Sequence, residues 1–219
     1  MKKILRLKQR GRIAGSFALL FVFFVALGLF STSGIERITR SFRSMYEDRL
    51  IPSMDISEML ALLYENRVSV ENHITTRDSL EMVKYERAVY INHKKLDSLV
   101  NKLSLTYLVP EEKRDLQQFT AALLVFRELE EKMLLKSRNG QTQEALEELT
   151  HSGDVLFHNA IRPLQKLELD QKVVGEQLYV ESLEIARIQK ITAYSITFAA
   201  VIVGLILAFA LTFASVDVD

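Results

Sequence analysis

Four histidines are the side chains of this sequence best suited to hold a metal or to carry a proton: His73, His93, His151 and His158. Glu148 and His151 form a Glu-x-x-His pair, a spacing that di-iron helical bundles use, but such a site needs two of these pairs and two further glutamates. The sequence has no cysteine, which excludes disulfides, a thiolate nucleophile and cysteine-ligated metals. We therefore interpret the histidines as surface or capping residues, and we expect no metal and no cofactor.

Other arrangements that could support catalysis are also missing from the sequence. It contains no Ser/His/Asp set and no glycine-rich phosphate motif in a loop. The charged runs "EEKRD" (111–115) and "ELEEK" (128–132) have the spacing of a solvated helix face with ion pairs one turn apart. The formal net charge of +0 argues against nucleic-acid binding, which requires a basic face. We expect a protein that is not an enzyme.

Two polar residues, Asn92 and Gln171, interrupt helical stripes that are otherwise apolar. A polar residue in such a stripe usually fixes register or partner choice, and contact with a ligand is the alternative. Counted outward from the membrane-spanning segments predicted below, Gln171 falls level with Tyr46 and Arg49. A site that binds a ligand or couples helices is predicted at this level, with the candidate residues Tyr46, Arg49, Pro52, Gln171 and Gly175.

Arg49 and Gly175 allow two interpretations of this site. A missing side chain at Gly175, next to a guanidinium and a proline kink, would leave a small pocket that accepts an anion. Alternatively, Arg49 pairs with its neighbours Glu47 or Asp48, because charges on exposed helices usually pair or are hydrated. Gly175 would then only relieve crowding.

The elements that carry these residues lie between two uncharged apolar runs, 13–31 and 191–213. Each is long enough to cross the ~30 Å core of a bilayer as a helix. Every ionisable side chain of residues 1–12 is cationic, which places that end in the cytoplasm. We predict two retained spans, residues 32–190 on the periplasmic side of a bacterial inner membrane, and a cytoplasmic tail at 214–219. A cleaved signal peptide is the alternative for the first run, but that run is longer than usual and lacks an A-x-A cleavage site.

Residues 32–190 carry apolar side chains at helical spacing in four stretches. Pro52 is expected to kink the first of them. The predicted turns are "TTRDS" (75–79), "YLVPEE" (107–112) and "SRNG" (137–140), and a short helix, "QTQEALEELT" (141–150), precedes the last long one. The sequence therefore predicts an all-α fold: an up-down-up-down four-helix bundle anchored by two transmembrane helices.

The second and third of these helices are too short to reach the membrane, so the first and fourth continue alone as a stalk. The apolar side chains of that stalk need cover from a second chain, which predicts a homodimer with coiled-coil packing. The second span adds a face of small residues, one turn apart, of the kind that lets membrane helices approach closely. The predicted dimer interface comprises Ile35, Phe42, Ile185, Ile188, Ala200, Gly204 and Ala208.

Two stretches of the sequence resemble a known family. "MYEDRLIPSMDISEMLALLYENR" (45–67) resembles the start of the outer domain of four-helix-bundle, HlyB-like input domains of methyl-accepting chemotaxis receptors. "LVPEEKRDLQQFTAALLVFRELEEKMLLKSRNGQTQEALEEL" (108–149) resembles the third helix of that domain, its turn and its short helix. The resemblance spans roughly residues 13–213 and implies a sensory input module.

Receptors of this family continue after the second span into a HAMP linker and a long signalling coiled coil, and neither follows here. We expect a module that senses a periplasmic ligand or protein and relays the signal through a separate membrane partner. The alternatives are an inner-membrane scaffold that binds an envelope partner, and a truncated receptor remnant.

Overall fold

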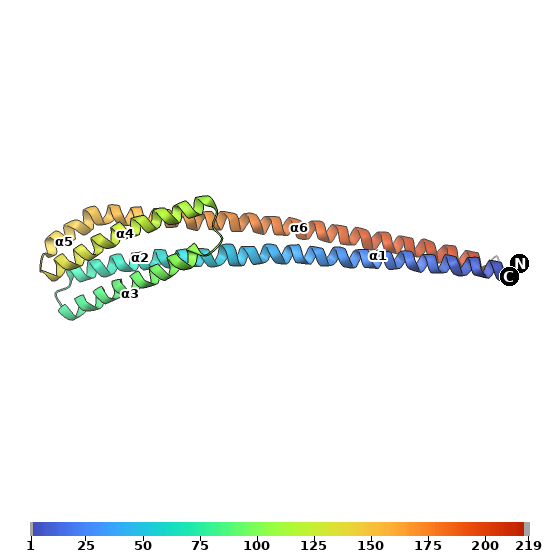
Figure 1. The fold of residues 1–219 in the computed structure, drawn as a ribbon, viewed down its shortest axis with the longest axis horizontal. Coiled ribbons are helices and arrows are strands. Elements are labelled where there is room, and N and C mark those ends of the chain that lie inside the picture. Colours follow the sequence, from blue (N-terminus) through green and yellow to red (C-terminus); the bar gives the residue numbers. More distant parts are fainter. Residues whose placement is uncertain (1, 217–219) are drawn as a thin grey trace. The chain divides into compact units, whose positions relative to one another are not determined.

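A computed structural model describes the backbone of residues 2–216 and the side chains of residues 14–209. These residues form only helices and short connections (Figure 1). In chain order the elements are α1 (Lys2–Ser44), the π-helical turn η1 (Met45–Leu50), α2 (Ile51–Thr75), α3 (Ser79–Ser104), α4 (Pro110–Arg138), α5 (Thr142–Glu148), the π-helical turn η2 (Leu149–Gly153) and α6 (Asp154–Val216). The predicted all-α fold is confirmed.

The chain divides into two compact units, which we describe separately. One comprises residues 44–177 and is the helical bundle; the other comprises residues 1–43 and 178–219. The predicted boundaries of the outer segment, 32–190, stay a prediction. Part of the predicted tail, residues 217–219, lies outside the described residues.

The predicted turns of the bundle form for local reasons. Asp78 caps α3, its side chain accepting a hydrogen bond from the Leu80 backbone N–H at 2.9 Å. Pro110 occupies the first turn of α4, where backbone N–H groups have no partner within the helix, so the N–H that proline lacks is not needed there. Gly140 ends that helix with a φ of 76°, a left-handed conformation that glycine adopts without strain. Four long helices therefore alternate in direction, with α5 at the far turn (Figure 1).

The bundle core contains two apolar clusters. One cluster includes Ile56, Leu63, Leu96, Phe126 and Leu164 and lies toward the end of the bundle where the chain enters and leaves. The second lies toward the α5 end and includes Val70, Val89, Met133, Ala145 and Leu149. Buried polar residues occur between the two clusters and at the entry end.

The helix that enters the bundle contains a π-helical turn immediately before Pro52, rather than the simple proline kink that the sequence predicted. Pro52 is buried in the first turn of α2, and the Ile51 backbone N–H bonds to the Tyr46 carbonyl, five residues back. A proline has no N–H to donate, so helical bonding changes around it. The wider turn also brings Arg49 to the inside, where it is buried although Leu50 beside it is exposed.

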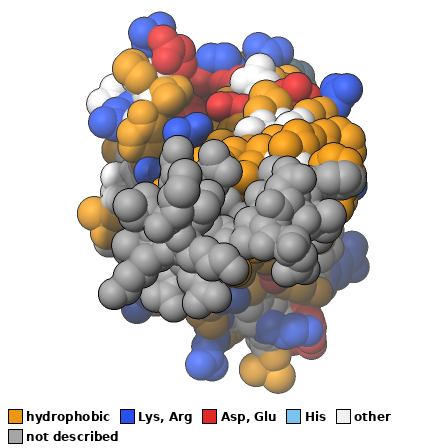
Figure 2. All heavy atoms as spheres, turned by 90° about the vertical axis from the view of Figure 1, so that its right-hand side faces the viewer, with side chains coloured by type: hydrophobic (Ala, Val, Ile, Leu, Met, Phe, Trp, Pro, Cys, Tyr) orange, Lys and Arg blue, Asp and Glu red, His pale blue; other side chains and the backbone are white. Residues whose placement is uncertain are grey.

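The other unit contains the two helical segments that are long and apolar enough to cross a membrane. The apolar windows lie within the helical stretches Ala14–Thr75 and Thr142–Phe209, and none of their residues is buried within the chain. Figure 2 shows hydrophobic side chains gathered on the visible surface beside the atoms drawn in grey. In this unit α1 and α6 approach closely at Gly34, where a Cβ would lie 2.5 Å from Gln189 Cδ.

Candidate functional site

A buried ion pair at the entry end of the bundle links three elements. Arg49 of η1 donates from Nη1 to Glu112 Oε1 of α4 at 2.7 Å and to Gln171 Oε1 of α6 at 3.2 Å. Gln171 Nε2 in turn donates to Glu112 Oε1 at 3.0 Å. We call these three residues the Arg49 network. Because each member bonds to both others, the network holds η1, α4 and α6 in one register.

All three side chains of the Arg49 network are buried, Arg49 being 7% exposed and the other two 1% each. Glu112 has a second role, because its Oε2 accepts the Val109 backbone N–H at 2.8 Å and caps the start of α4. A buried charge is stable only when it is paired and hydrogen-bonded. Through Glu112, the turn before α4 is therefore held to Arg49 of the helix that enters the bundle. This contact lies at the level where counting residues placed Arg49 and Gln171.

The structure contradicts one of the two sequence interpretations of Arg49, its pairing with Glu47 or Asp48, and the anion pocket stays a prediction. Arg49 pairs with Glu112 and not with its neighbours, and Asp48 instead accepts the Ser44 hydroxyl at 2.7 Å. The guanidinium charge is thereby balanced within the chain, so an anion would have to compete with a buried carboxylate. Counting residues along a helix predicts level but not rotation, which is why Glu112 was not identified as the partner.

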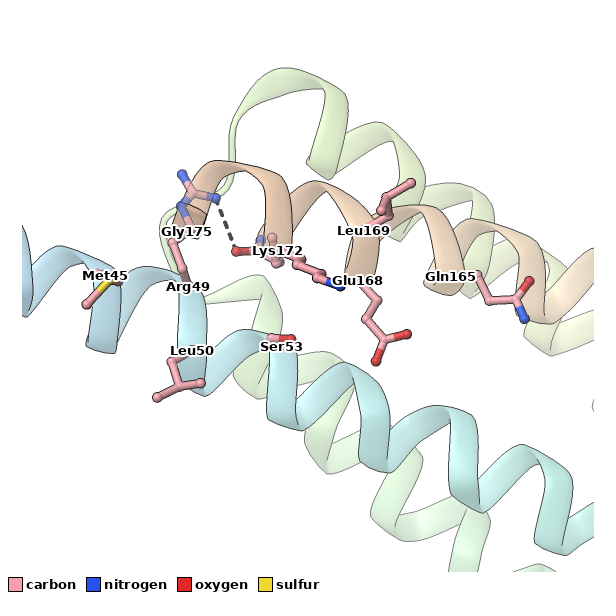
Figure 3. Close-up of a pocket in the computed structure, with 10 residues that line it drawn as sticks. Met45, Arg49, Leu50, Ser53, Gln165, Glu168, Leu169, Lys172 and Gly175 are labelled. Carbon is pink, nitrogen blue, oxygen red and sulfur yellow. Dashed lines mark hydrogen bonds between the residues drawn. The ribbon is translucent and has the colours of Figure 1, made fainter. Parts of the chain in front are cut away.

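A groove of about 580 Å³ lies beside the Arg49 network. It is lined by Met45, Arg49, Leu50, Ser53, Gln165, Glu168, Leu169, Gln171, Lys172 and Gly175. Figure 3 shows Arg49 reaching from the helix that carries Met45 and Ser53 toward the helix that carries Lys172 and Gly175, with Glu168 between them. Three of the five predicted candidates, Arg49, Gln171 and Gly175, thus line one groove.

The remaining predicted candidates lie around this groove without lining it. Tyr46 is exposed, and Pro52 is buried at the start of α2. Gly175 leaves room rather than a tight contact, since a Cβ there would lie 3.8 Å from Arg49 Cβ, an ordinary van der Waals distance. Arg49 Nε is buried and has no hydrogen-bond partner within the described part of the chain.

The interpretation of the histidines as surface residues is wrong for two of them. His73 is fully buried and bonds through Nδ1 to Ser137 Oγ at 3.0 Å, and burial lowers the pKa of its imidazole. His93 Nε2 lies 2.7 Å from Glu130 Oε2. Burial raises the pKa of the Glu130 carboxyl, and the hydrogen bond to His93 opposes that rise. His151 is exposed and bonds to the Glu147 carbonyl of its own helix.

The charged runs that suggested a solvated helix face each contain buried carboxylates. Glu112 and Asp115 of "EEKRD" are buried, and so is Glu130 of "ELEEK". Asp115 accepts two hydrogen bonds from Lys166 of α6, at 2.7 and 3.0 Å. No group of three or more potential metal ligands occurs within residues 14–209.

The predicted dimer residues lie in the unit outside the bundle and differ in exposure. Ile35, Phe42 and Ile188 are 63%, 46% and 53% exposed, whereas Ile185 is partly covered. A Cβ at Gly204 would lie 3.8 Å from Leu20 Cδ2 of the first span in the same chain. The small-residue face of the second span, which also holds Ala200 and Ala208, therefore packs in part against its own chain at Gly204.

Comparison with known proteins agrees with the architecture. No curated protein and no solved structure matches the chain. A family model described as a four helix bundle sensory module for signal transduction matches residues 6–186. The match confirms the resemblance to the input domains of methyl-accepting chemotaxis receptors. By its fold and by this match, which covers most of its length, the chain belongs to the family of four-helix-bundle sensory modules for signal transduction.

Proposed function

We propose that this protein is a transmembrane input module whose bundle senses a periplasmic small molecule in the groove beside the Arg49 network. In this proposal the protein is oriented with both termini in the cytoplasm, because the ionisable side chains of residues 1–12 are all cationic. A separate membrane partner that receives the signal stays a prediction. Sensory modules of this family typically carry no catalytic activity, and none is proposed.

The observation that carries this proposal is the joint position of the groove and the Arg49 network. Both include residues of η1 and α6, the elements that lead out of the bundle toward the two candidate spans. A ligand that moves Leu169 or Lys172 on α6 also acts on Gln171, which bonds to Arg49. Packed helices slide by ~1–2 Å between discrete arrangements, and such a displacement can pass along a continuous helix.

The lining of the groove indicates the chemistry of its ligand. Met45, Leu50 and Leu169 are apolar, whereas Glu168 and Lys172 offer one charge of each sign. Glu168 accepts the Ser57 hydroxyl at 2.5 Å and is therefore already held in place. A small ligand with one polar end and one apolar end would satisfy both kinds of wall.

The experiment is a melting screen of the full chain in lipid nanodiscs against amino acids, organic acids and sugars. A ligand that binds only the folded state raises the melting temperature. Leu169→Trp fills the groove and is expected to abolish the shift. Leu124→Trp fills a separate hollow between α3 and α4, lined by Val100, Thr120 and Leu124 among others, and is the matched control. A shift that survives Leu169→Trp, or no shift in the whole panel, contradicts the groove as the sensing site.

We further propose that the working unit is a parallel homodimer. An exposed stripe on the first bundle helix supports it: Leu50, Met54, Tyr64 and Val68 are each 47% or more exposed. With Ser57 and Ala61 between them, their spacing alternates by four and three residues, the a/d repeat of a coiled coil. Outside the bundle, a second chain would also bury the exposed apolar side chains of Ile35, Phe42 and Ile188.

Cross-linking of single cysteines in native membranes tests the dimer, because the chain has no cysteine of its own. Ile35→Cys and Met54→Cys are expected to form disulfides between subunits. Glu58→Cys, exposed on the same helix but off the stripe, is the control that should stay monomeric. Gly204→Ile is a poor test, since it would also disturb packing within the chain. Absence of cross-linking at both stripe positions in folded protein would favour a monomeric scaffold.

A further inference from the structure

A second set of buried polar residues lies at one level of the bundle core. Ser137 of α4 donates to the His73 carbonyl of α2 at 3.0 Å, which aligns these two helices. Both run in the same direction, so Asn66 and Glu130, each about two turns earlier, also share a level. The 2.7 Å contact between Glu130 and His93 brings α3 to this level.

We call Asn66, Asn92, His93 and Glu130 the polar layer. Asn66 is 0% exposed, Asn92 3% and Glu130 1%. The layer separates the two apolar clusters. On one side it is flanked by Leu63, Leu96 and Phe126 of the entry-end cluster. On the other side it is flanked by Val70, Val89 and Met133 of the cluster toward α5.

The polar layer contains several buried atoms without a hydrogen-bond partner in the described part of the chain. They are Asn66 Oδ1, Asn66 Nδ2, Asn92 Nδ2 and Glu130 Oε1. Leaving one buried polar group unsatisfied costs about 1–3 kcal/mol. Four such atoms at one level of a core are unusual, since buried polar groups nearly always have partners.

The unpartnered atoms include both donors and acceptors, and the charge state of Glu130 decides which are needed. An ionised carboxylate only accepts, so Glu130 Oε1 then requires a donor such as the amide nitrogen of Asn66 or Asn92. A protonated carboxyl also donates and requires an acceptor such as Asn66 Oδ1. One asparagine can serve both states by turning its amide.

We propose that the polar layer is a proton-binding site, and that uptake of a proton by the Glu130/His93 pair is a stimulus to which the bundle responds. A proton needs no cavity, which suits a layer that is closed on both sides by apolar side chains. His93 is the entry point, because its side chain is 14% exposed whereas that of Glu130 is 1% exposed.

The charged groups around Glu130 are few. His93 faces it from α3, and Arg127 and Glu131 act on it from its own helix. Arg127 is itself held by Asp97 at 2.7 Å and by the His93 carbonyl at 3.0 Å. Arg67 of α2, next to Asn66 in the chain, is paired with Asp154 of α6. Protonation therefore changes the charge of the layer with little compensation, and it alters the bonds between α2, α3 and α4.

The test is a pH titration of the full chain in nanodiscs, with the proton as the only added ligand. Spin labels on Ser98→Cys and Val125→Cys, both exposed and on α3 and α4, report the distance between these helices. Acidification from about pH 8 to about pH 5 is expected to shift or broaden that distance by about 1–2 Å. Glu130→Gln is expected to abolish the shift, together with the infrared band of a buried protonated carboxyl.

Glu131→Gln removes the neighbouring exposed carboxylate and should titrate like the parent protein. Asn66→Leu provides a second variant that stays folded, and it should reduce the distance change because it removes the amide that could serve both charge states of Glu130. A parent protein with no pH-dependent change, or a Glu130→Gln or Asn66→Leu variant that changes as the parent does, overturns the proposal. The stimulus assignment rests on the proposed sensory function, but proton uptake is measured on the chain alone. A negative result here and a negative groove screen are therefore separate findings.

Discussion

The Arg49 network and the polar layer are two polar clusters in one helical core, and they differ in how many of their buried atoms lack partners in the described part of the chain: one in the network, Arg49 Nε, and four in the layer. In the network, Arg49, Glu112 and Gln171 bond to one another at 2.7 to 3.2 Å, and Glu112 also caps α4. In the layer, Asn66 has no partner for either amide atom within the described residues. A network whose members all bond to one another specifies one arrangement, whereas a layer with several spare donors and acceptors allows more than one. The first suits a joint that transmits movement, and the second suits an element that changes state.

The largest effect that tests this difference between the two clusters is expected when Glu112, the carboxylate of the Arg49 network, is removed. Glu112→Ala leaves Arg49 buried without its charge partner and should destabilise the bundle by about 3–5 kcal/mol. Glu111→Ala, at the exposed neighbouring position, should change the free energy of unfolding by less than about 1 kcal/mol. Urea unfolding of the full chain in detergent measures both. A triple variant, Arg49→Met with Glu112→Leu and Gln171→Leu, leaves no member of the network unpaired and should recover much of the loss; failure to recover would show that the cap, not the ion pair, matters.

Replacing one amide in each cluster by leucine should have opposite effects. Asn66→Leu removes two unpartnered atoms and should stabilise the bundle by about 1–3 kcal/mol. Gln171→Leu removes a bond to Arg49 and one to Glu112 and should destabilise it by a similar amount. Melting temperatures of the two variants, compared with the parent, give the signs directly. Equal signs would mean that the two clusters do not differ in the way described.

The stability of the polar layer should depend on pH in a direction set by Glu130. Because burial raises the pKa of this carboxyl above its ordinary 4.5, the folded state holds the proton more strongly than the unfolded state. That contribution is fully present below pH 4.5 and is lost as the pH rises through the folded-state pKa. As the pH rises from 4.5, the melting temperature of the parent should therefore fall relative to that of Glu130→Gln.

His73 provides an internal control for this pH dependence. Burial lowers the pKa of its imidazole below 6.5, so its contribution is present above pH 6.5 and is lost on acidification. The parent should therefore lose stability relative to His73→Gln as the pH falls below 6.5. This pH dependence has the opposite sign from that of the comparison with Glu130→Gln. A difference between the parent and Glu130→Gln that does not vary with pH would contradict the role of this carboxyl.

Particular residues mark how far the sequence could predict this molecule. The turns at Asp78, Pro110 and Gly140 were predictable because each depends on a local property of one residue type. The common level of Arg49 and Gln171 was predictable because rise per residue is constant along a helix. Glu130 was not identified as a core residue, because a single glutamate in a charged run has the same local pattern whether it is buried or solvated.

The smallest expected effect concerns Gly175, and it separates two roles for the groove. A Cβ at this position would meet Arg49 Cβ at 3.8 Å, which is ordinary contact, so Gly175→Ala fits without moving the network. Alanine in a helix is favoured over glycine by about 0.5–1 kcal/mol, and the variant should be stabilised by that amount. Gly140→Ala is the control of opposite sign, since a φ of 76° strains any residue with a side chain by about 1–2 kcal/mol.

The two roles predict different ligand responses for the stabilised Gly175→Ala variant. If the ligand needs the space over Gly175, the added methyl should reduce the melting shift although the fold has become more stable. If Gly175 is only part of the joint between α6 and η1 and the ligand does not use the space over it, the shift should match that of the parent. A destabilised variant would contradict both, because it would mean that the helices pack more closely here than the 3.8 Å separation allows. Gly175→Ala thus tests whether the region next to the Arg49 network is a binding surface or only a joint between helices.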